Sequence, residues 1–214
     1  MSFNHGGCVC GAVRYTTSAT PMRVTVCHCK FCQRATGSAY MVEPIFARAA
    51  FEITAGTPST YIHISEGSGK RVTIHFCVGC GTKLFLTFER FEGVCGVYAG
   101  TFDDPNWFER SPKTSRHIFL DSAQQGTVIP AGFKAYRQHA TRNDGTPLEP
   151  LVFEQPQTIA GALTSIIEAV TIQARWPGQA GHDIRNVRVQ AFASPQPPAA
   201  DSLSCVLVSK SVAS

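Results

Sequence analysis

Residues 26–37 read VCHCKFCQRATG, and this segment places Cys27, Cys29 and Cys32 within six positions. Two further groups of cysteines lie along the chain, one before this segment and one after it. They are Cys8 with Cys10 and Cys77 with Cys80. In a chain without an export signal, clusters of this kind bind metal more often than they form disulfides. The three groups therefore predict zinc, bound within a fold that brings distant cysteines together.

The number of clustered cysteines does not divide into two closed zinc sites. Zinc takes four ligands in structural sites, but three protein ligands and an open position in catalytic sites. Seven clustered cysteines therefore predict one closed site and one open site, with two zinc ions per chain. An open zinc ion can bind and polarise a thiolate, a carbonyl group or water.

The spacing of the cysteines leaves their partition open, although the compact triplet most naturally forms the open site. The other four would then join the N-terminus to a distant turn, where Gly79 and Gly81 let the backbone fold around a metal. The alternative is a second closed site, completed by a histidine beside the triplet. The candidates are His28, which a strand would point to the opposite face, His75 and His5.

Composition and charge exclude several classes of protein. The chain has 214 residues, of which 43% are hydrophobic, and its formal net charge is +4. The basic residues are scattered, so a nucleic-acid partner is not expected. No apolar run reaches the roughly 18 residues of a membrane helix, so no membrane partner is expected. The N-terminal segment lacks the features of a secretory signal, and we expect a cytoplasmic protein.

The first hundred residues are typical of short strands. Eight segments are rich in β-branched and aromatic residues and are separated by Gly, Pro, Ser and Asp. They span residues 11–18, 23–29, 39–47, 51–56, 59–65, 71–77, 82–88 and 93–102. This pattern predicts a mainly β fold of antiparallel strands in two packed sheets. Residues 123–150 interrupt it and are expected to be irregular.

The character of the chain changes after about Pro150. Residues 158–175 show helical spacing of apolar positions, and residues 184–193 and 203–210 favour two strands. We expect a zinc-binding β domain at 1–140 and a C-terminal extension at 141–214 with one helix and two strands. The extension would shape the substrate pocket or form the contact of a homodimer.

Four segments resemble the glutathione-dependent formaldehyde-activating enzyme family, also called the centromere-protein-V/formaldehyde-activating (GFA) domain. They are GGCVCGAVRY (6–15), CHCKFCQRATGSAY (27–40), FCVGCGTKLF (76–85) and YAGTFDDP (98–105). The resemblance implies an Mss4-like (β-tent) zinc-binding fold of packed antiparallel sheets. It also implies a structural zinc on Cys8, Cys10, Cys77 and Cys80, and a catalytic zinc on Cys27, Cys29 and Cys32.

The resemblance further implies a carbon–sulfur lyase of formaldehyde detoxification, an S-(hydroxymethyl)glutathione synthase that joins glutathione to formaldehyde. Gln33, Arg34 and Thr36 follow the triplet directly and are the expected substrate-binding residues. An arginine suits this role because its planar fork can hold a carboxylate through two hydrogen bonds. Two alternatives remain open: a non-catalytic, Mss4-like zinc module that binds a partner, and an enzyme of the same family with another thiol or carbonyl substrate.

Overall fold

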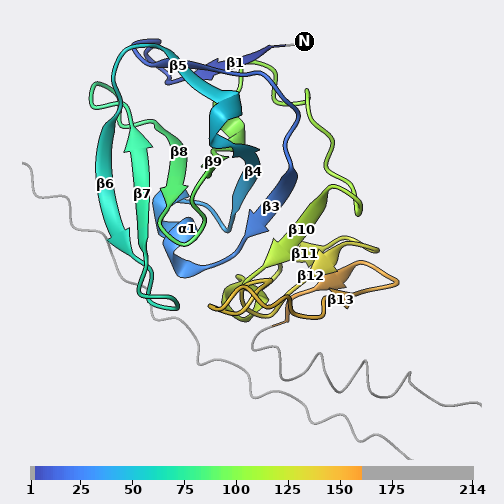
Figure 1. Ribbon diagram of the computed structural model, residues 1–214. Helices are drawn as coiled ribbons and strands as arrows, with labels where there is room; N and C mark the ends of the chain where they lie inside the picture. Colours follow the sequence, from blue (N-terminus) through green and yellow to red (C-terminus); the bar gives the residue numbers. More distant parts are fainter. Residues whose placement is uncertain (1–2, 161–214) are drawn as a thin grey trace, which may run out of the picture. The chain divides into compact units, whose positions relative to one another are not determined.

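A computed structural model describes residues 3–160 of the chain. Within this range the chain forms three β-sheets, one α-helix and three short 3-10 turns (Figure 1). The mainly β fold predicted from the sequence is therefore confirmed. The two strands predicted at 184–193 and 203–210 lie outside the described residues. So does the helix predicted at 158–175, apart from its first three residues.

The elements are short, and most strands have four to seven residues. The first half of the described chain contains β1 (Asn4–Gly7), β2 (Arg14–Thr17), β3 (Arg23–Cys27), α1 (Lys30–Thr36), β4 (Met41–Ala47), η1 (Arg48–Ala50), β5 (Phe51–Ala55), β6 (Ser59–Ile64) and β7 (Arg71–Phe76). The second half contains β8 (Lys83–Phe88), β9 (Val94–Val97), η2 (Ala99–Thr101), β10 (Ser115–Ile118), η3 (Leu120–Ser122), β11 (Val128–Ile129), β12 (Lys134–Ala135), β13 (Leu151–Val152) and β14 (Gln157–Thr158).

The largest sheet has nine strands in the order β13-β12-β10-β3-β4-β9-β8-β7-β6. Neighbouring strands are antiparallel, except that β10 pairs in parallel with both β3 and β12. A second sheet has the order β1-β2-β5, and β11 with β14 form a third. Each of the eight predicted segments contains one of the strands β2 to β9. The sequence pattern did not indicate β1 or β10, and three sheets form where two were expected.

Residues 123–150 are mostly irregular, as expected, but two short strands interrupt them. These strands, β11 and β12, pair with β14 and β13 from farther along the chain. The predicted boundary at residue 140 therefore falls between strands that hydrogen-bond to one another. The division into residues 1–140 and 141–214 stays a prediction. No helix among residues 3–160 is long and apolar enough to cross a membrane.

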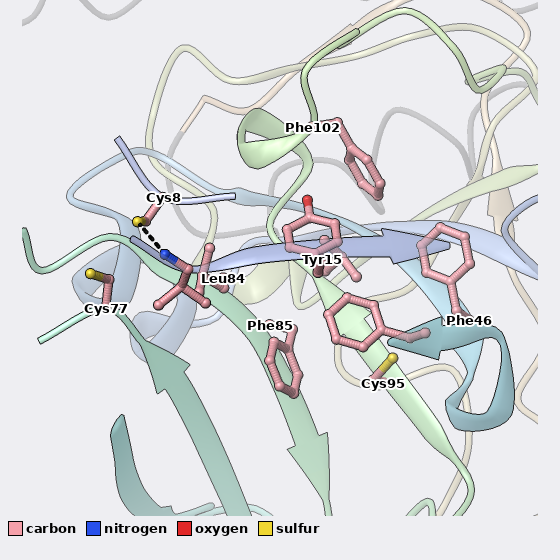
Figure 2. Packing of buried hydrophobic residues seen from close by; sticks show 11 residues of the cluster. Cys8, Tyr15, Phe46, Cys77, Leu84, Phe85, Cys95 and Phe102 are labelled. Atoms are coloured by element: carbon pink, nitrogen blue, oxygen red, sulfur yellow. Dashed lines mark hydrogen bonds between the residues drawn. The ribbon is translucent and has the colours of Figure 1, made fainter. Parts of the chain in front are cut away.

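A core of aromatic side chains packs where the three-stranded sheet meets the large one. Tyr15 of β2 is fully buried; its ring stacks on Phe51 at 5.0 Å and meets Phe102 edge-on at 5.4 Å. Figure 2 shows this cluster with Cys8 and Cys77 at one end of it. Cys8 and Cys77 are thus packed directly against the hydrophobic core, which holds their backbone in place.

Candidate functional site

The structure brings the four cysteines outside the triplet into one group. The sulfur atoms of Cys8, Cys10, Cys77 and Cys80 all lie within 4.8 Å of one another. The Sγ atoms of Cys8 and Cys10 are 3.5 Å apart, and those of Cys10 and Cys77 are 3.7 Å apart. Zn–S bonds of about 2.3 Å in a tetrahedron place neighbouring sulfurs roughly 3.8 Å apart. The donor type, number and spacing therefore fit a closed, four-coordinate zinc site.

Two turns supply these four sulfurs. Cys8 and Cys10 lie just after β1, and the Val13 amide donates a hydrogen bond of 3.2 Å to Cys8 Sγ. Cys77 directly follows β7, and the Gly81 amide donates to its carbonyl oxygen at 2.8 Å. Gly81 has φ 72°, which closes the turn around the cysteine pair in the left-handed region that glycine reaches without strain. The expected turn around a metal is therefore present.

The remaining three clustered cysteines form a second group, around the start of the α-helix. Cys27 ends β3, Cys29 is the N-cap of α1, and Cys32 lies in its first turn. The Cys32 amide donates to Cys29 Sγ at 3.3 Å, and all three sulfurs lie within 4.8 Å of one another. Cys27 and Cys32 are buried, whereas Cys29 is partly exposed.

The pKa values of the three thiols of this group differ from one another. Hydrogen bonds from Cys27 and Cys32 lower the pKa of Cys29 to about 3. The hydrogen bond with Cys29 in turn raises the pKa of Cys27 well above its usual value. The site thus already favours one thiolate, which is the form of cysteine that binds metal. The donor set fits a zinc ion with three protein ligands.

No histidine or carboxylate within residues 3–160 joins the triplet as a fourth ligand. His28 directly follows β3 and is fully buried, with its Nε2 3.1 Å from Nδ1 of His117. His75 Nε2 lies 3.0 Å from the Thr87 hydroxyl, and His5 is exposed on β1. Among the described residues, the alternative of a histidine that closes the second site therefore finds no support.

The triplet lies in the wall of a large cleft of about 1410 Å³. One face of the nine-stranded sheet lines this cleft. Five residues of this face that line the cleft lie in one row across neighbouring strands, namely Tyr61, Ile74, Leu86, Ile45 and Arg23. The helix α1 closes one side. Phe31 of α1 stacks on His63 of β6 at a centroid distance of 4.4 Å, which joins the helix to the far edge of the sheet.

The three expected substrate-binding residues lie in different surroundings. Both donors of the Gln33 amide are engaged, by the carbonyl oxygens of His28 at 2.6 Å and Ser122 at 2.7 Å. The Thr36 hydroxyl donates to the Cys32 carbonyl at 2.8 Å inside the helix. Arg34 is exposed and lines the cleft. A role in substrate binding stays a prediction for all three, and Arg34 is the best placed for it.

Sequence reasoning missed a group of charged side chains on the floor of the cleft. Arg23, Glu43 and Arg116 lie there on adjacent strands, and Glu43 is buried. For Glu43 alone a signal was available in the sequence, because this residue interrupts the otherwise apolar stretch MVEPIFA. A charged residue at an inward position of a strand is seldom left without a partner.

Fold and site together define a mainly β protein with two cysteine clusters suited to metal, one of them in a cleft. Comparison with protein families matches residues 3–122 to the glutathione-dependent formaldehyde-activating enzyme family. The match covers more than half of the chain, and the chain belongs to this family. The search of curated proteins finds no match.

Among solved structures, a Rhodobacter sphaeroides protein determined as a structural-genomics target is similar in part. It is 18% identical, and the alignment covers 46% of this chain and 87% of that one, with a TM-score of 0.38.

Proposed function

We propose that the protein is a zinc-dependent carbon–sulfur lyase of the formaldehyde-activating type, which adds a thiol to a small aldehyde. Glutathione is the proposed thiol and formaldehyde the proposed aldehyde. The reaction forms one carbon–sulfur bond and moves the thiol proton to the carbonyl oxygen, so it needs no oxidant or further reactant. A cytoplasmic location and a homodimer stay predictions.

The observation that carries this proposal is the unequal division of the cysteines. One cluster has four sulfurs beside the aromatic core, and the other has three sulfurs in the wall of the cleft. Four thiolates complete the coordination of zinc, whereas three leave one position for a substrate. The family to which the chain belongs is named for a reaction between a thiol and an aldehyde, which suits such a position.

Each residue around the triplet has a distinct part in this proposal. Cys27, Cys29 and Cys32 would hold the metal, and bound zinc would keep the substrate sulfur deprotonated, which makes it nucleophilic. Gln33 ties the start of α1 to the Ser122 carbonyl and so fixes the position of the three sulfurs. Arg34 places a positive charge at the side of the cleft, where an anionic thiol would enter.

Exchange NMR on mixtures of glutathione and formaldehyde tests the proposal. The zinc-loaded full-length protein should speed formation of the S-hydroxymethyl adduct above the uncatalysed rate, and Cys29→Ser should abolish that gain. Cys95→Ser is the matched control, because Cys95 is buried in the core and outside both clusters. An exchange rate equal to that of the protein-free mixture would rule out the proposed activity.

A further inference from the structure

Three charged side chains gather on one face of the large sheet, deep in the cleft. In the register of the strands, Thr25 of β3 is flanked by Arg116 of β10 on one side and by Glu43 of β4 on the other. Arg23 lies two residues before Thr25 and therefore on the same face. All four residues line the cleft. The two guanidinium groups and the carboxyl group thus form one cluster, which we call the charged floor.

The charged floor has unused hydrogen-bonding capacity. The Nε atoms of Arg23 and Arg116 and the Oε1 atom of Glu43 are buried and have no hydrogen-bond partner among residues 3–160. No ion pair within that range joins the three side chains to one another. A buried polar atom without a partner destabilises the fold, because it has lost its hydrogen bonds to water. Three such atoms in one cleft indicate a group that accepts or donates hydrogen bonds there when a ligand is bound.

Strand β9 leaves room for the Glu43 side chain at one glycine, Gly96. Gly96 of β9 lies opposite Ile45, which is two residues after Glu43 on β4 and on the same face of the sheet. A Cβ atom at Gly96 would lie 1.9 Å from Oε1 of Glu43. The Glu43 carboxyl group therefore rests on the backbone of β9, and any larger residue at position 96 would displace it.

The charge of the floor favours an anion. Burial raises the pKa of Glu43 to about 8, against the opposing effect of Arg23, so this carboxyl group is mostly uncharged at neutral pH. Burial lowers the pKa of both arginines, yet a guanidinium group stays protonated in proteins. Two positive charges, with a neutral carboxyl group that can itself donate a hydrogen bond, complement a carboxylate.

The distance from the triplet matches a small peptide thiol. Thr25 and Cys27 are two residues apart on β3 and face the same side, which places the floor about 7 Å from the cysteine along the strand. One residue of an extended peptide spans roughly 3.5 Å, so a carboxylate one or two residues from a thiol reaches that far. A thiol held at the triplet could therefore place a carboxylate on the floor.

We propose that Arg23 and Arg116, with Glu43 beside them, form a subsite for a carboxylate of the substrate thiol, so that the cleft selects anionic thiols over neutral ones. This inference deepens the proposed function and rests on it for the identity of the substrate. Arg34 at the side of the cleft and the two arginines on its floor would then act at different places on the same ligand.

Calorimetric titration of the zinc-loaded full-length protein with S-methylglutathione tests the subsite. The methyl group blocks the sulfur, so the measured affinity reports the rest of the molecule, and no reaction takes place. The diester of S-methylglutathione is the matched probe, because it has nearly the same size but lacks both carboxylates. Arg23→Gln and Arg116→Gln remove the guanidinium groups, and Arg110→Gln is the control because Arg110 is exposed and outside the cleft.

We expect S-methylglutathione to bind at least about tenfold more tightly than its diester, because hydrogen bonds from charged groups to a carboxylate contribute at least that much affinity. Each floor variant should lose most of that preference, and the control should keep it. Equal affinity for acid and diester in the unaltered protein would overturn the proposal without recourse to any variant, as would floor variants that keep the full preference. Because the titration involves no catalysis, its outcome is separate from a failure of the proposed lyase activity.

Discussion

At the scale of single residues, the two cysteine clusters differ in what surrounds them more than in what they contain. Cys8 and Cys77 are buried at the end of the aromatic core. Cys29, in contrast, is partly exposed in a cleft, although Cys27 and Cys32 are buried in a second hydrophobic cluster. A metal at the four-cysteine cluster would stabilise the fold, whereas a metal at the triplet would take part in the function.

The first prediction concerns the number of zinc ions. Cys29→Ser should lower the zinc content of anaerobically purified protein from two ions per chain to one, because two thiolates hold zinc poorly. The fold should persist, since the other cluster keeps its ligands. Elemental analysis with circular dichroism measures both, and Cys95→Ser should keep two ions. One zinc ion in both the unaltered protein and Cys29→Ser would show that the triplet holds no metal.

The second prediction concerns pH and Glu43. The pKa of this carboxyl group rises from 4.5 to about 8 on folding. Between these values the folded state binds more protons than the unfolded state, so the free energy of unfolding falls as pH rises. Glu43→Gln cannot titrate and should escape this loss, with an advantage of about 1 kcal/mol or more at pH 8 and almost none at pH 4.5. Denaturant unfolding across that range measures the difference.

The difference in the free energy of unfolding between Glu43→Gln and the unaltered protein does not contain the titration of the cysteines, because both proteins have the same cysteines. A constant difference between Glu43→Gln and the unaltered protein from pH 4.5 to pH 8 would mean that Glu43 keeps an ordinary pKa. The charged floor would then carry one negative charge at neutral pH.

At the scale of elements, the register of the large sheet builds the cleft. The row that lines it passes from Tyr61 of β6 to Arg23 of β3 through paired positions on β7, β8, β9 and β4. Side chains fill this row except at Gly96, where β9 supplies only backbone. This gap is the space that the Glu43 carboxyl group occupies.

The third prediction tests this gap. Gly96→Ala should lower the free energy of unfolding by about 1–3 kcal/mol, because the new methyl group collides with the Glu43 side chain and forces it to move. The matched control is Gly100→Ala, since a Cβ at Gly100 meets no atom within 4 Å. Urea unfolding measures both variants. Equal stability of the two would mean that Glu43 does not rest on β9.

At the scale of the whole molecule, the four-cysteine cluster joins parts of the chain that are far apart in sequence. Its sulfurs come from the turn after β1 and from the turn between β7 and β8, and Cys10 and Cys77 are 67 positions apart. A metal at this cluster would connect the three-stranded sheet to the nine-stranded one. The triplet, in contrast, comes from one short segment and closes no long loop.

The fourth prediction follows from this contrast. Cys80→Ser should lower the Tm by roughly 5–10 °C, since loss of a structural metal removes a few kcal/mol and each kcal/mol shifts the Tm of a chain of this size by about 2–4 °C. Cys29→Ser should change the Tm by less. Differential scanning calorimetry measures both, and a larger shift for Cys29→Ser would reverse the two roles. Cys80 is exposed, so its replacement opens no cavity.

Strands β2 to β9 could be predicted from the sequence because their β-branched and aromatic residues are a local signal. Strand β1, with the sequence NHGG, and strand β10, with SRHI, lack that signal and form only by pairing with β2 and with β3. The grouping of the cysteines could likewise be predicted, since the residue type and the short spacing within each group indicate metal ligands. The charged floor could not, because Arg23, Glu43 and Arg116 become neighbours only through the register of three strands.

Strand propensity and the spacing within a cysteine cluster are properties of short segments, so the mainly β character of this protein and its two groups of cysteines suited to metal could be inferred from the sequence. The tertiary structure was needed to bring Cys8 and Cys10 to Cys77 and Cys80 and to pair His28 with His117. It also placed the triplet in a cleft and a buried carboxyl group in one cluster with two arginines. The side chains of Arg23, Glu43 and Arg116 are 20 to 93 positions apart in the chain and meet only when the sheet sets its order and register.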